Sequence, residues 1–358
     1  RSSDRSTFES IPQKGSGGGK LNIIHGYGRG SKHFELIDIL AMQSLPAWNG
    51  ATYLAASNFN CLEFVSPGQT ASDGVTYYYA DPTQGPYTAL ACGPACVYRN
   101  YFIEHDGVSG QIKSQIELLK DTPIPVTNGY AIIHSDDDLA KKFLDEEPEH
   151  EEEKKGIFKK LFSRKPKESP KLDKARKKLS EFDWSNPSIW KVGVHRNCEV
   201  VMKRGKNNGF AYSPPGLIAH HVYAAAFNFA SDVTRTDLTT KITNELLTAE
   251  YRASILAAWE NSIKFPGRPG SKKLSLTLLG GGVFHNSMDD ICGAIRANIE
   301  LIKESGLDVY ITCFNDSIFR SVNAYLSDMV KETGGRIVDS NNDDDCLELM
   351  GNEEEEDE

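Results

Sequence analysis

The stretch LSLTLLGGGVFHN (274–286) is the most informative part of the sequence, because it reads as a buried strand that ends in a glycine-rich loop. The segments that follow repeat this order of elements. DDICGAIRANIELIKES (289–305) carries isoleucines at helical spacing, LDVYITCF (307–314) reads as another buried strand, and DSIFRSVNAYLSDMVKET (316–333) reads as another helix. A short last strand is expected at RIVDS (336–340). This close alternation predicts a parallel or mixed sheet with helices on both faces.

The same alternation extends toward the N-terminus. Strands are expected at LNIIHGY (21–27), ATYLAASN (51–58) and KVGVHRNCEVVM (191–202), and a long amphipathic helix is expected over residues 242–263. We therefore predict one α/β domain over residues 21–350, with three layers, a mixed central sheet, extra helices and a charged insertion.

Two other segments predict further helices. IKSQIELLKD (112–121) is one of them, and LIAHHVYAAAFNFA (217–230), which follows a Pro-Pro-Gly start, is expected to be a buried helix. On that helix the adjacent His220 and His221 would point about 100° apart and could not hold one metal ion on one face. No metal site and no cofactor are expected.

Three segments are expected to lie outside the packed domain. Residues 1–20 are polar and rich in Gly and Ser, which predicts a flexible N-terminal segment. Residues 145–178 begin with DEEPEHEEE (145–153) and continue with a basic stretch, so we interpret them as a mobile charged insertion. Residues 351–358 form an acidic tail.

Composition excludes several classes of protein. Six of the ten net negative charges lie in the last six residues, so the rest of the chain is only mildly acidic and no nucleic-acid partner is expected. No apolar run approaches 18 residues, which predicts no transmembrane segment, and no secretory signal is visible. The chain does not begin with Met, and we expect an upstream segment to have been trimmed. Seven cysteines at low density favour a reduced, cytoplasmic protein, and we expect a monomer.

Three loops could carry chemistry. Gly280–Asn286 could bind a phosphate through backbone N–H groups, but it has His285 where the dinucleotide fingerprint needs glycine, and it lacks the Gly-Lys-Ser/Thr of a P-loop. Ala55–Glu63 could bind a sugar through its Asn amides and Phe59. The loop from Ser72 to Pro86 is long, aromatic and carries two acids. Each loop also has a purely structural alternative. The glycine loop could be a tight turn, the Asn residues of the second loop could only hold turns, and the third loop could be an extended surface loop.

The first and second of these loops together resemble the macrodomain family, whose members bind or remove ADP-ribose. Ala55–Asn58 resembles the family's first ligand loop, in which an Asn faces the distal ribose. Gly280–Asn286 resembles the second, in which backbone amides hold the diphosphate and an aromatic residue, here Phe284, packs on the ribose. The resemblance is clearest over residues 50–66 and 272–332.

This sequence departs from the family pattern in two places. The first loop continues with Phe59-Asn60-Cys61-Leu62-Glu63 instead of glycines and an Asp, and the Gln-Glu-Glu signature of poly(ADP-ribose) glycohydrolases is missing. The long loop SPGQTASDGVTYYYADPTQGP (66–86) resembles a divergent branch that includes bacterial effectors, which would act in the host cytoplasm. Members of that branch remove ADP-ribose from arginine, notably on ubiquitin.

The resemblance implies an ADP-ribosyl hydrolase that acts on a modified protein, with arginine as the linkage, ubiquitin as a candidate partner and ADP-ribose as ligand or product. Cleavage at a ribose carbon needs a carboxylate to stabilise charge or activate water. The candidate catalytic residues are Asp73, Asp81, Asp289 and Asp290. Asp289 and Asp290 lie in the first turn of a helix, where complementing the helix dipole is an alternative role.

The candidate ligand-binding residues are Asn58, Phe59, Asn60, Glu63, Gly280, Gly281, Gly282, Val283, Phe284, His285 and Asn286. Two other functions remain open at this point. One is a module of the same fold that binds ADP-ribose without cleaving it, which the missing family signatures favour. The other is a nucleotide-dependent enzyme on a Rossmann-like sheet, against which the glycine spacing argues.

Overall fold

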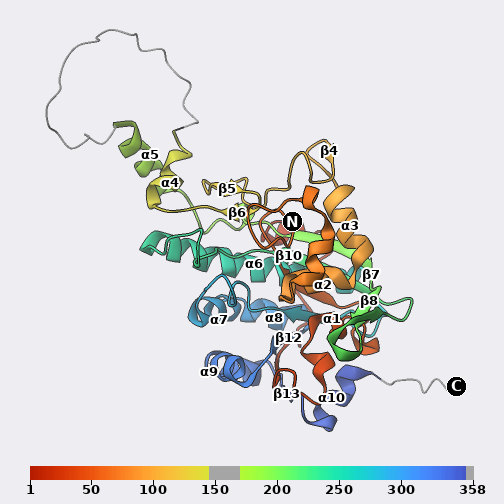
Figure 1. Cartoon of the computed structure of the whole chain (residues 1–358). Coiled ribbons are helices and arrows are strands. Elements are labelled where there is room, and N and C mark those ends of the chain that lie inside the picture. The colour runs from red at the N-terminus through yellow and green to blue at the C-terminus, as the bar shows by residue number, and fades with distance from the viewer. Residues whose placement is uncertain (145–169, 352–358) are drawn as a thin grey trace, which may run out of the picture.

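The computed structural model describes residues 1–144 and 170–351, and its centre is a seven-stranded sheet with the order β13-β1-β12-β11-β2-β10-β7 (Figure 1). Adjacent strands are parallel except at one edge, where β7 runs antiparallel to β10. The strands are β1 (Lys20–His25), β2 (Thr52–Ala56), β7 (Gly193–Glu199), β10 (Ile218–Ala224), β11 (Lys273–Leu276), β12 (Asp308–Cys313) and β13 (Ile337–Asp339).

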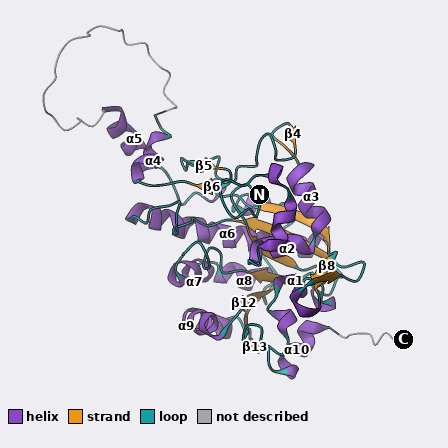
Figure 2. Ribbon diagram, viewed as in Figure 1, coloured by secondary structure: helices purple, strands orange, loops and turns teal. Residues whose placement is uncertain are grey.

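Helices cover both faces of this sheet (Figure 2). One face packs against α6, α7, α8 and α9, and the other packs against α1, α2, α3 and α10. The helices are α1 (Ile39–Met42), α2 (Gln84–Ala91), α3 (Gly93–Tyr101), α4 (Asp136–Lys141), α5 (Pro170–Glu181), α6 (Asp237–Lys264), α7 (Met288–Arg296), α8 (Ile299–Ser305), α9 (Asp316–Glu332) and α10 (Asp343–Met350). The predicted three-layer α/β fold with a mixed sheet is therefore confirmed.

Three short hairpins stand apart from the main sheet. Their strands are β3 (Glu104–His105), β4 (Val108–Ser109), β5 (Val126–Thr127), β6 (Tyr130–Ala131), β8 (Met202–Arg204) and β9 (Phe210–Tyr212).

The central strands are apolar because both of their faces are buried. In β1, Ile23 packs in the cluster that contains α6 and α9, whereas its neighbour Ile24 packs in the cluster on the opposite face. Tyr310 and Ile311 divide in the same way on β12. Successive side chains on a strand point to opposite faces, so a strand covered on both sides must be apolar at consecutive positions.

The long helix α6 fixes the chain just after β11. Buried Tyr251 donates a hydrogen bond from its Oη to the carbonyl of Thr277 (2.9 Å) and accepts one from the N–H of Leu279 (3.0 Å). The side chain of Thr236 caps the start of this helix by accepting from the N–H of Thr239. The segment that enters the glycine loop is therefore held by a rigid element.

The prediction of a helix over residues 217–230 is wrong, because these residues contain β10. The strand lies between β2 and β7 and is buried on both faces, so its sequence shows no alternation that would separate it from a buried helix. His220 and His221 therefore lie on opposite faces of the sheet. His220 stacks on Phe265, whereas the Nε2 of His221 lies 2.7 Å from the Oε1 of Gln43.

The other helix predictions also need correction. Residues 112–121 form turns instead of a helix, and the N–H of Leu118 donates to the carbonyl of Phe59. The helix predicted at 289–305 is divided into α7 and α8 at Asn298, whose amide donates to the carbonyls of Ala294 and Thr248. A side chain that satisfies backbone groups in this way can interrupt a helix despite continuous apolar spacing.

The N-terminal segment also differs from its prediction as a flexible arm. Phe8 is buried in the main core, and the backbone of Ser3 donates to the carbonyl of Trp190. Arg5 forms an ion pair with Glu304 at 3.1 Å. One buried aromatic and a few anchored polar groups thus dock a segment whose composition looks like a linker.

Two of the predicted outer segments lie mainly beyond the described residues. Residues 145–169 and 352–358, which hold most of the charged insertion and of the acidic tail, are outside them. Residues 170–178 belong to α5, which packs on α4 through Ala175 and Leu179. No helix in the described part of the chain is long and apolar enough to cross a membrane.

The buried histidines predict a pH dependence of stability. Burial lowers the pKa of His195 and of His220 to about 4 each, and lowers that of His221 well below its ordinary value. In the unfolded chain these side chains titrate near about 6.5, so the unfolded state binds more protons between about pH 6.5 and 4. We expect the contribution of these histidines to the free energy of unfolding, measured in urea, to fall as the pH drops through this window.

His220→Asn tests the contribution of one histidine, because the Asn Oδ1 can replace the ring Nδ1 that accepts the N–H of Asn197. The variant cannot titrate in this window, and its stability should depend on pH with a slope smaller by about one proton. An unchanged slope would contradict the assignment, whatever the variant's absolute stability.

Candidate functional site

The topology of the sheet places a crevice between β2 and β11. The chain leaves β2 toward α2 and α3, on one face of the sheet, and leaves β11 toward α7, on the opposite face. Diverging connections of this kind leave a crevice at the carboxyl ends of parallel strands, where α/β proteins bind ligands. Two adjoining cavities occupy this position.

The larger cavity has a volume of about 570 Å³ and the smaller one about 380 Å³, which is within the range of ligand sites. The larger cavity lies among the loops that follow β2 and β11 and the segment from Ala80 to Pro86. The smaller cavity extends toward α1, α9 and the end of β12. The two share Pro82, Gln84, Thr277, Leu278 and Gly282.

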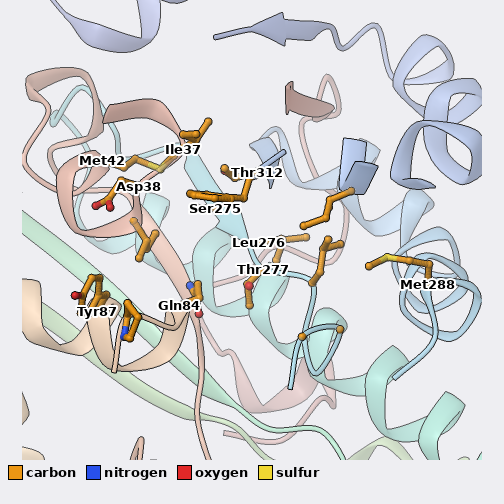
Figure 3. Close-up of a pocket in the computed structure, with 17 residues that line it drawn as sticks. Ile37, Asp38, Met42, Gln84, Tyr87, Ser275, Leu276, Thr277, Met288 and Thr312 are labelled. Carbon is orange, nitrogen blue, oxygen red and sulfur yellow. The ribbon is translucent and has the colours of Figure 1, made fainter. Parts of the chain in front are cut away.

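The smaller cavity is mostly apolar (Figure 3). Met42 and Asp38 lie on one side and Met288 on the other, with Gln84 and Thr277 between them. Asp38 does not offer a free charge, because its Oδ1 caps α1 at the N–H of Ala41 and its Oδ2 pairs with Arg204 at 2.6 Å.

The glycine loop, which lines the larger cavity, contains unpaired backbone donors. Gly280, Gly282, Val283 and Phe284 all line this cavity. Within the described residues, none of their four N–H groups has a protein acceptor. Successive free N–H groups in a concave loop form an anion-binding site.

Hydrogen bonds from neighbouring segments hold the glycine loop in place. The amide of Asn286 donates to the carbonyls of Phe227 (2.8 Å) and Gly280 (3.3 Å), and the N–H of Phe229 donates to the carbonyl of Phe284. Gly280 has a φ of +72°, and a Cβ there would lie 2.4 Å from the Nδ2 of Asn286. Asn286 therefore shapes the loop and does not line either cavity.

Gln84 joins the third loop to the end of β2. Its amide donates to the carbonyl of Leu54 (2.8 Å) and accepts from the N–H of Ala56 (2.9 Å). Next to it, a Cβ at Gly85 would lie 1.6 Å from the carbonyl oxygen of Ala56, so only glycine allows this approach. The loop that carries Asp81 is thereby fixed against the sheet.

A buried ion pair shapes the first loop from below. The guanidinium of Arg99 pairs with the Oε2 of Glu63 at 2.6 Å, donates to the carbonyl of Cys61 and lies over the ring of Tyr223. The side chain of Glu63 has no exposed surface. Burial raises the pKa of Glu63, and the charge of Arg99 opposes that shift. Glu63 lines the larger cavity, but its Oε2 pairs with Arg99 and its Oε1 is buried with no hydrogen-bond partner among the described residues, so we assign it a supporting role.

The predicted Asn and Phe residues of the first loop fall into two groups. Asn58 lines the larger cavity, and its Nδ2 donates to the carbonyl of Phe64 at 2.8 Å. Phe59 is buried in the core, where it packs on Phe227, and Asn60 uses its Oδ1 to accept the N–H of Leu62. The structure therefore does not bring Phe59 or Asn60 to either cavity.

The four candidate catalytic acids also differ in whether they reach a cavity. Asp81 lines the larger cavity, where its Oδ1 accepts the N–H of Thr83 and its other oxygen has no bonded partner. Asp73 lies outside both cavities and caps its own turn by accepting from Thr70. Asp289 is exposed on α7, and Asp290 pairs with Arg235 at 3.3 Å. Asp81 is the one of the four candidate catalytic acids that the structure places at a cavity.

Most of the predicted second-loop residues line one of the two cavities. Gly280, Gly282, Val283 and Phe284 line the larger cavity, and Gly281 lines the smaller one. His285, with a φ of +57°, lines neither cavity, and its carbonyl accepts from Arg235.

Several residues of the site escaped the sequence analysis. Tyr130 lines the larger cavity, with its ring centroid 6.2 Å from that of Phe284, and its hydroxyl donates to the carbonyl of Phe64. Phe314 lines the smaller cavity. The position of Phe314 at the end of the strand expected at 307–314 was a usable signal, whereas Tyr130 reaches the site only through tertiary packing.

The charged side chains that line the two cavities, within the described residues, are Asp38, Glu63 and Asp81. An anionic ligand must therefore rely on backbone donors here. No three His, Cys, Asp or Glu side chains in residues 1–144 and 170–351 lie close enough together to hold a metal ion.

No family model and no curated protein matches this sequence. Among solved structures, the chain is similar to poly(ADP-ribose) glycohydrolase from Deinococcus radiodurans in complex with ADP-ribose, with 11% identity, 91% of this chain and 90% of that chain covered, and a TM-score of 0.40. The apo form of that enzyme matches at 13% identity and a TM-score of 0.30, over 46% of this chain. There the match spans 64% of the length of the solved chain.

A macrodomain from Oceanobacillus iheyensis with MES bound is also similar, with 13% identity, 46% of this chain and 72% of that chain covered, and a TM-score of 0.27. Likenesses at this level do not define a function.

The ion pair below the first loop leads to a stability prediction. Glu63→Gln leaves the charge of Arg99 buried without a counter-ion, and removal of one partner from a buried pair typically costs about 3–5 kcal/mol. The double variant Glu63→Gln/Arg99→Met should lose less than the sum of the two single variants, as measured by urea unfolding.

The exposed pair Arg296–Asp328, at 2.8 Å, is the matched control. Asp328→Asn should change stability by only about 0–1 kcal/mol. If Glu63→Gln costs no more than this control, the buried pair does not support the loop as described.

Proposed function

We propose that this protein removes ADP-ribose from a modified protein side chain, with arginine as the linkage and ubiquitin as a candidate target. The observation that carries this proposal is the set of unpaired N–H groups at Gly280, Gly282, Val283 and Phe284, on the wall of a cavity with a free carboxylate at Asp81. The macrodomain resemblance of the sequence supports the same ligand.

The diphosphate would lie on the glycine loop, where the two cavities meet at Gly282. Backbone N–H groups suit this role because they donate hydrogen bonds and carry partial positive charge without a side chain. A Cβ at Gly282 would meet nothing within 4 Å, so a phosphate can approach the backbone closely there.

The two cavities suit the two ends of ADP-ribose. The smaller cavity offers Ile37, Met42 and Phe314 to a flat base, and the Oγ1 of Thr312 is buried with no partner among the described residues. The larger cavity offers polar groups of Asn58 and Asp81 to a ribose. This arrangement would place the bond to the modified side chain in the larger cavity.

Asp81 is the residue that we propose for the chemistry. Cleavage at the ribose anomeric carbon passes through an oxocarbenium-like state, which a carboxylate can stabilise directly or through an activated water. The leaving guanidinium is cationic, so the same carboxylate could also hold it by a charge-assisted hydrogen bond. The buried pair with Arg99 leaves Glu63 unsuited to either task.

Gly282→Glu tests the diphosphate site. The new carboxylate would lie where the anion must bind, and repulsion at about 4 Å amounts to roughly 4 kcal/mol at an effective dielectric of about 20. We expect calorimetry to show at least about a tenfold loss of affinity for ADP-ribose. Gly282→Gln has the same size without the charge and is the control; equal affinities for the Glu and Gln variants would place the diphosphate elsewhere.

Asp81→Asn tests the chemistry. We expect hydrolysis of ADP-ribosylated arginine to slow by about 10²–10⁴ while ADP-ribose still binds, because the amide keeps the shape but cannot take up a proton or offset charge. Asp73→Asn is the control on the same loop, and full activity is expected because Asp73 caps its own turn.

If the wild-type protein binds ADP-ribose but cleaves no arginine-, glutamate- or serine-linked substrate, the hydrolase proposal is wrong and the protein is a non-catalytic binding module. Failure to bind ADP-ribose, together with binding of NAD or ATP, would instead favour a nucleotide-dependent enzyme.

A further inference from the structure

Exposed apolar side chains lie on the loops that form the larger cavity and on the turn that leads into one of them. Val65 is 61% exposed and Val283 is 67% exposed, and both line the cavity from different loops. Tyr77 (53% exposed) and Tyr79 (62% exposed) lie on the helical turn Val75–Ala80, directly before Asp81. We call Val65, Tyr77, Tyr79 and Val283 the rim.

The tyrosines of the rim are held rigidly by the residue between them. Tyr78 is 1% exposed, packs on Phe64 with ring centroids 5.3 Å apart, and accepts the N–H of Glu63 at 2.9 Å. Because a 3₁₀ helix turns about 120° per residue, a buried Tyr78 leaves both of its neighbours on the surface. Their exposure is therefore imposed by a well-anchored turn.

The valines of the rim are also held in place. The residue before Val65 is fixed through its carbonyl, which accepts from Asn58 and Tyr130, and the N–H of Val65 donates to the Oε1 of Gln69. Val283 lies on the glycine loop that Asn286 anchors. A surface that is ordered before binding has less conformational entropy to lose on binding.

The charge inside the mouth limits the kind of partner. The charged side chains that line the larger cavity, as far as the described residues go, are the acids Glu63 and Asp81. Glu63 is fully buried and its charge is paired with Arg99, whereas Asp81 is partly exposed and its Oδ2 has no bonded partner among those residues. A partner that complements this mouth presents a cationic side chain at its centre and apolar groups around it. Exposed tyrosines beside a cavity are typical of protein interfaces.

We propose that the rim docks a folded protein substrate, which places its ADP-ribosylated cationic side chain into the cavity and its neighbouring apolar residues on Tyr77 and Tyr79. This inference rests on the function proposed above and specifies how the substrate is recognised. A free ADP-ribosylated amino acid fills only the cavity, whereas a folded protein also contacts the rim.

The test compares two substrates, ADP-ribosylated arginine as the free amino acid and a folded protein ADP-ribosylated on a surface arginine, with ubiquitin as the protein used. Tyr77→Ala and Tyr79→Ala remove rim contacts without touching the residues that line the cavity. We expect the double variant to raise KM for the protein at least about tenfold, with kcat and the KM for the amino acid unchanged. Tyr212→Ala, at a tyrosine that is 90% exposed on β9, is the control and should change neither.

The outcomes separate the inference from the proposed function. If the wild type cleaves neither substrate and does not bind ADP-ribose, the proposed function fails and the inference fails with it. If the wild type cleaves both substrates but the tyrosine variants alter both equally or neither, the inference alone is overturned. It is also overturned if sedimentation velocity shows a wild-type dimer that Tyr79→Ala dissociates, because a second copy of the chain would then cover the rim.

Discussion

The ion pair between Arg99 and Glu63 is the constraint on which the candidate site depends. A charge removed from water must be paired and hydrogen-bonded, and here the guanidinium meets a carboxylate, a carbonyl and an aromatic face in the interior. These contacts tie α3 to the loop after β2 and keep that loop in one shape. Because the loop is fixed from below, Asn58 and Phe64 form a stable wall of the larger cavity, and Tyr78 can anchor the turn that leads to Asp81.

The candidate site offers different groups to a negative charge and to a positive charge. The glycine loop, with its unpaired N–H groups, and Asp81, with one unpaired carboxylate oxygen, line the larger cavity from different loops. In the proposed reaction this separation matters, because a lysine that held the diphosphate would also repel a cationic guanidinium a few ångströms away. Backbone donors bind the anion without adding a net charge.

Rigid supports recur around the crevice, and each consists of a buried or half-buried polar group that satisfies backbone atoms. Tyr251 holds the segment after β11, Asn286 closes the glycine loop, and Gln84 ties the third loop to β2. A buried polar side chain in this position is costly unless it is bonded, so each of these contacts selects one conformation of a loop that would otherwise have many. Both cavity walls and the rim are thereby arranged before any ligand arrives.

The sequence by itself determined the fold class and the position of the glycine loop that lines the larger cavity. The strand and glycine loop at 274–286, the alternation after it and the long helix α6 were all readable, because apolar periodicity and glycine placement are local properties. Tertiary structure decided the rest. Residues 217–230 became a strand because the sheet covers them on both faces, and the sequence cannot distinguish a buried strand from a buried helix. Asp73 and Asp81 look alike in the sequence, but only Asp81 reaches the cavity, since Gln84 fixes its end of the loop to β2. Glu63 looked like a ligand-binding acid, and only the position of Arg99, on a distant helix, turned it into a buried support. A side chain's chemistry depends on which groups surround it, and that is set by contacts between segments far apart in the chain.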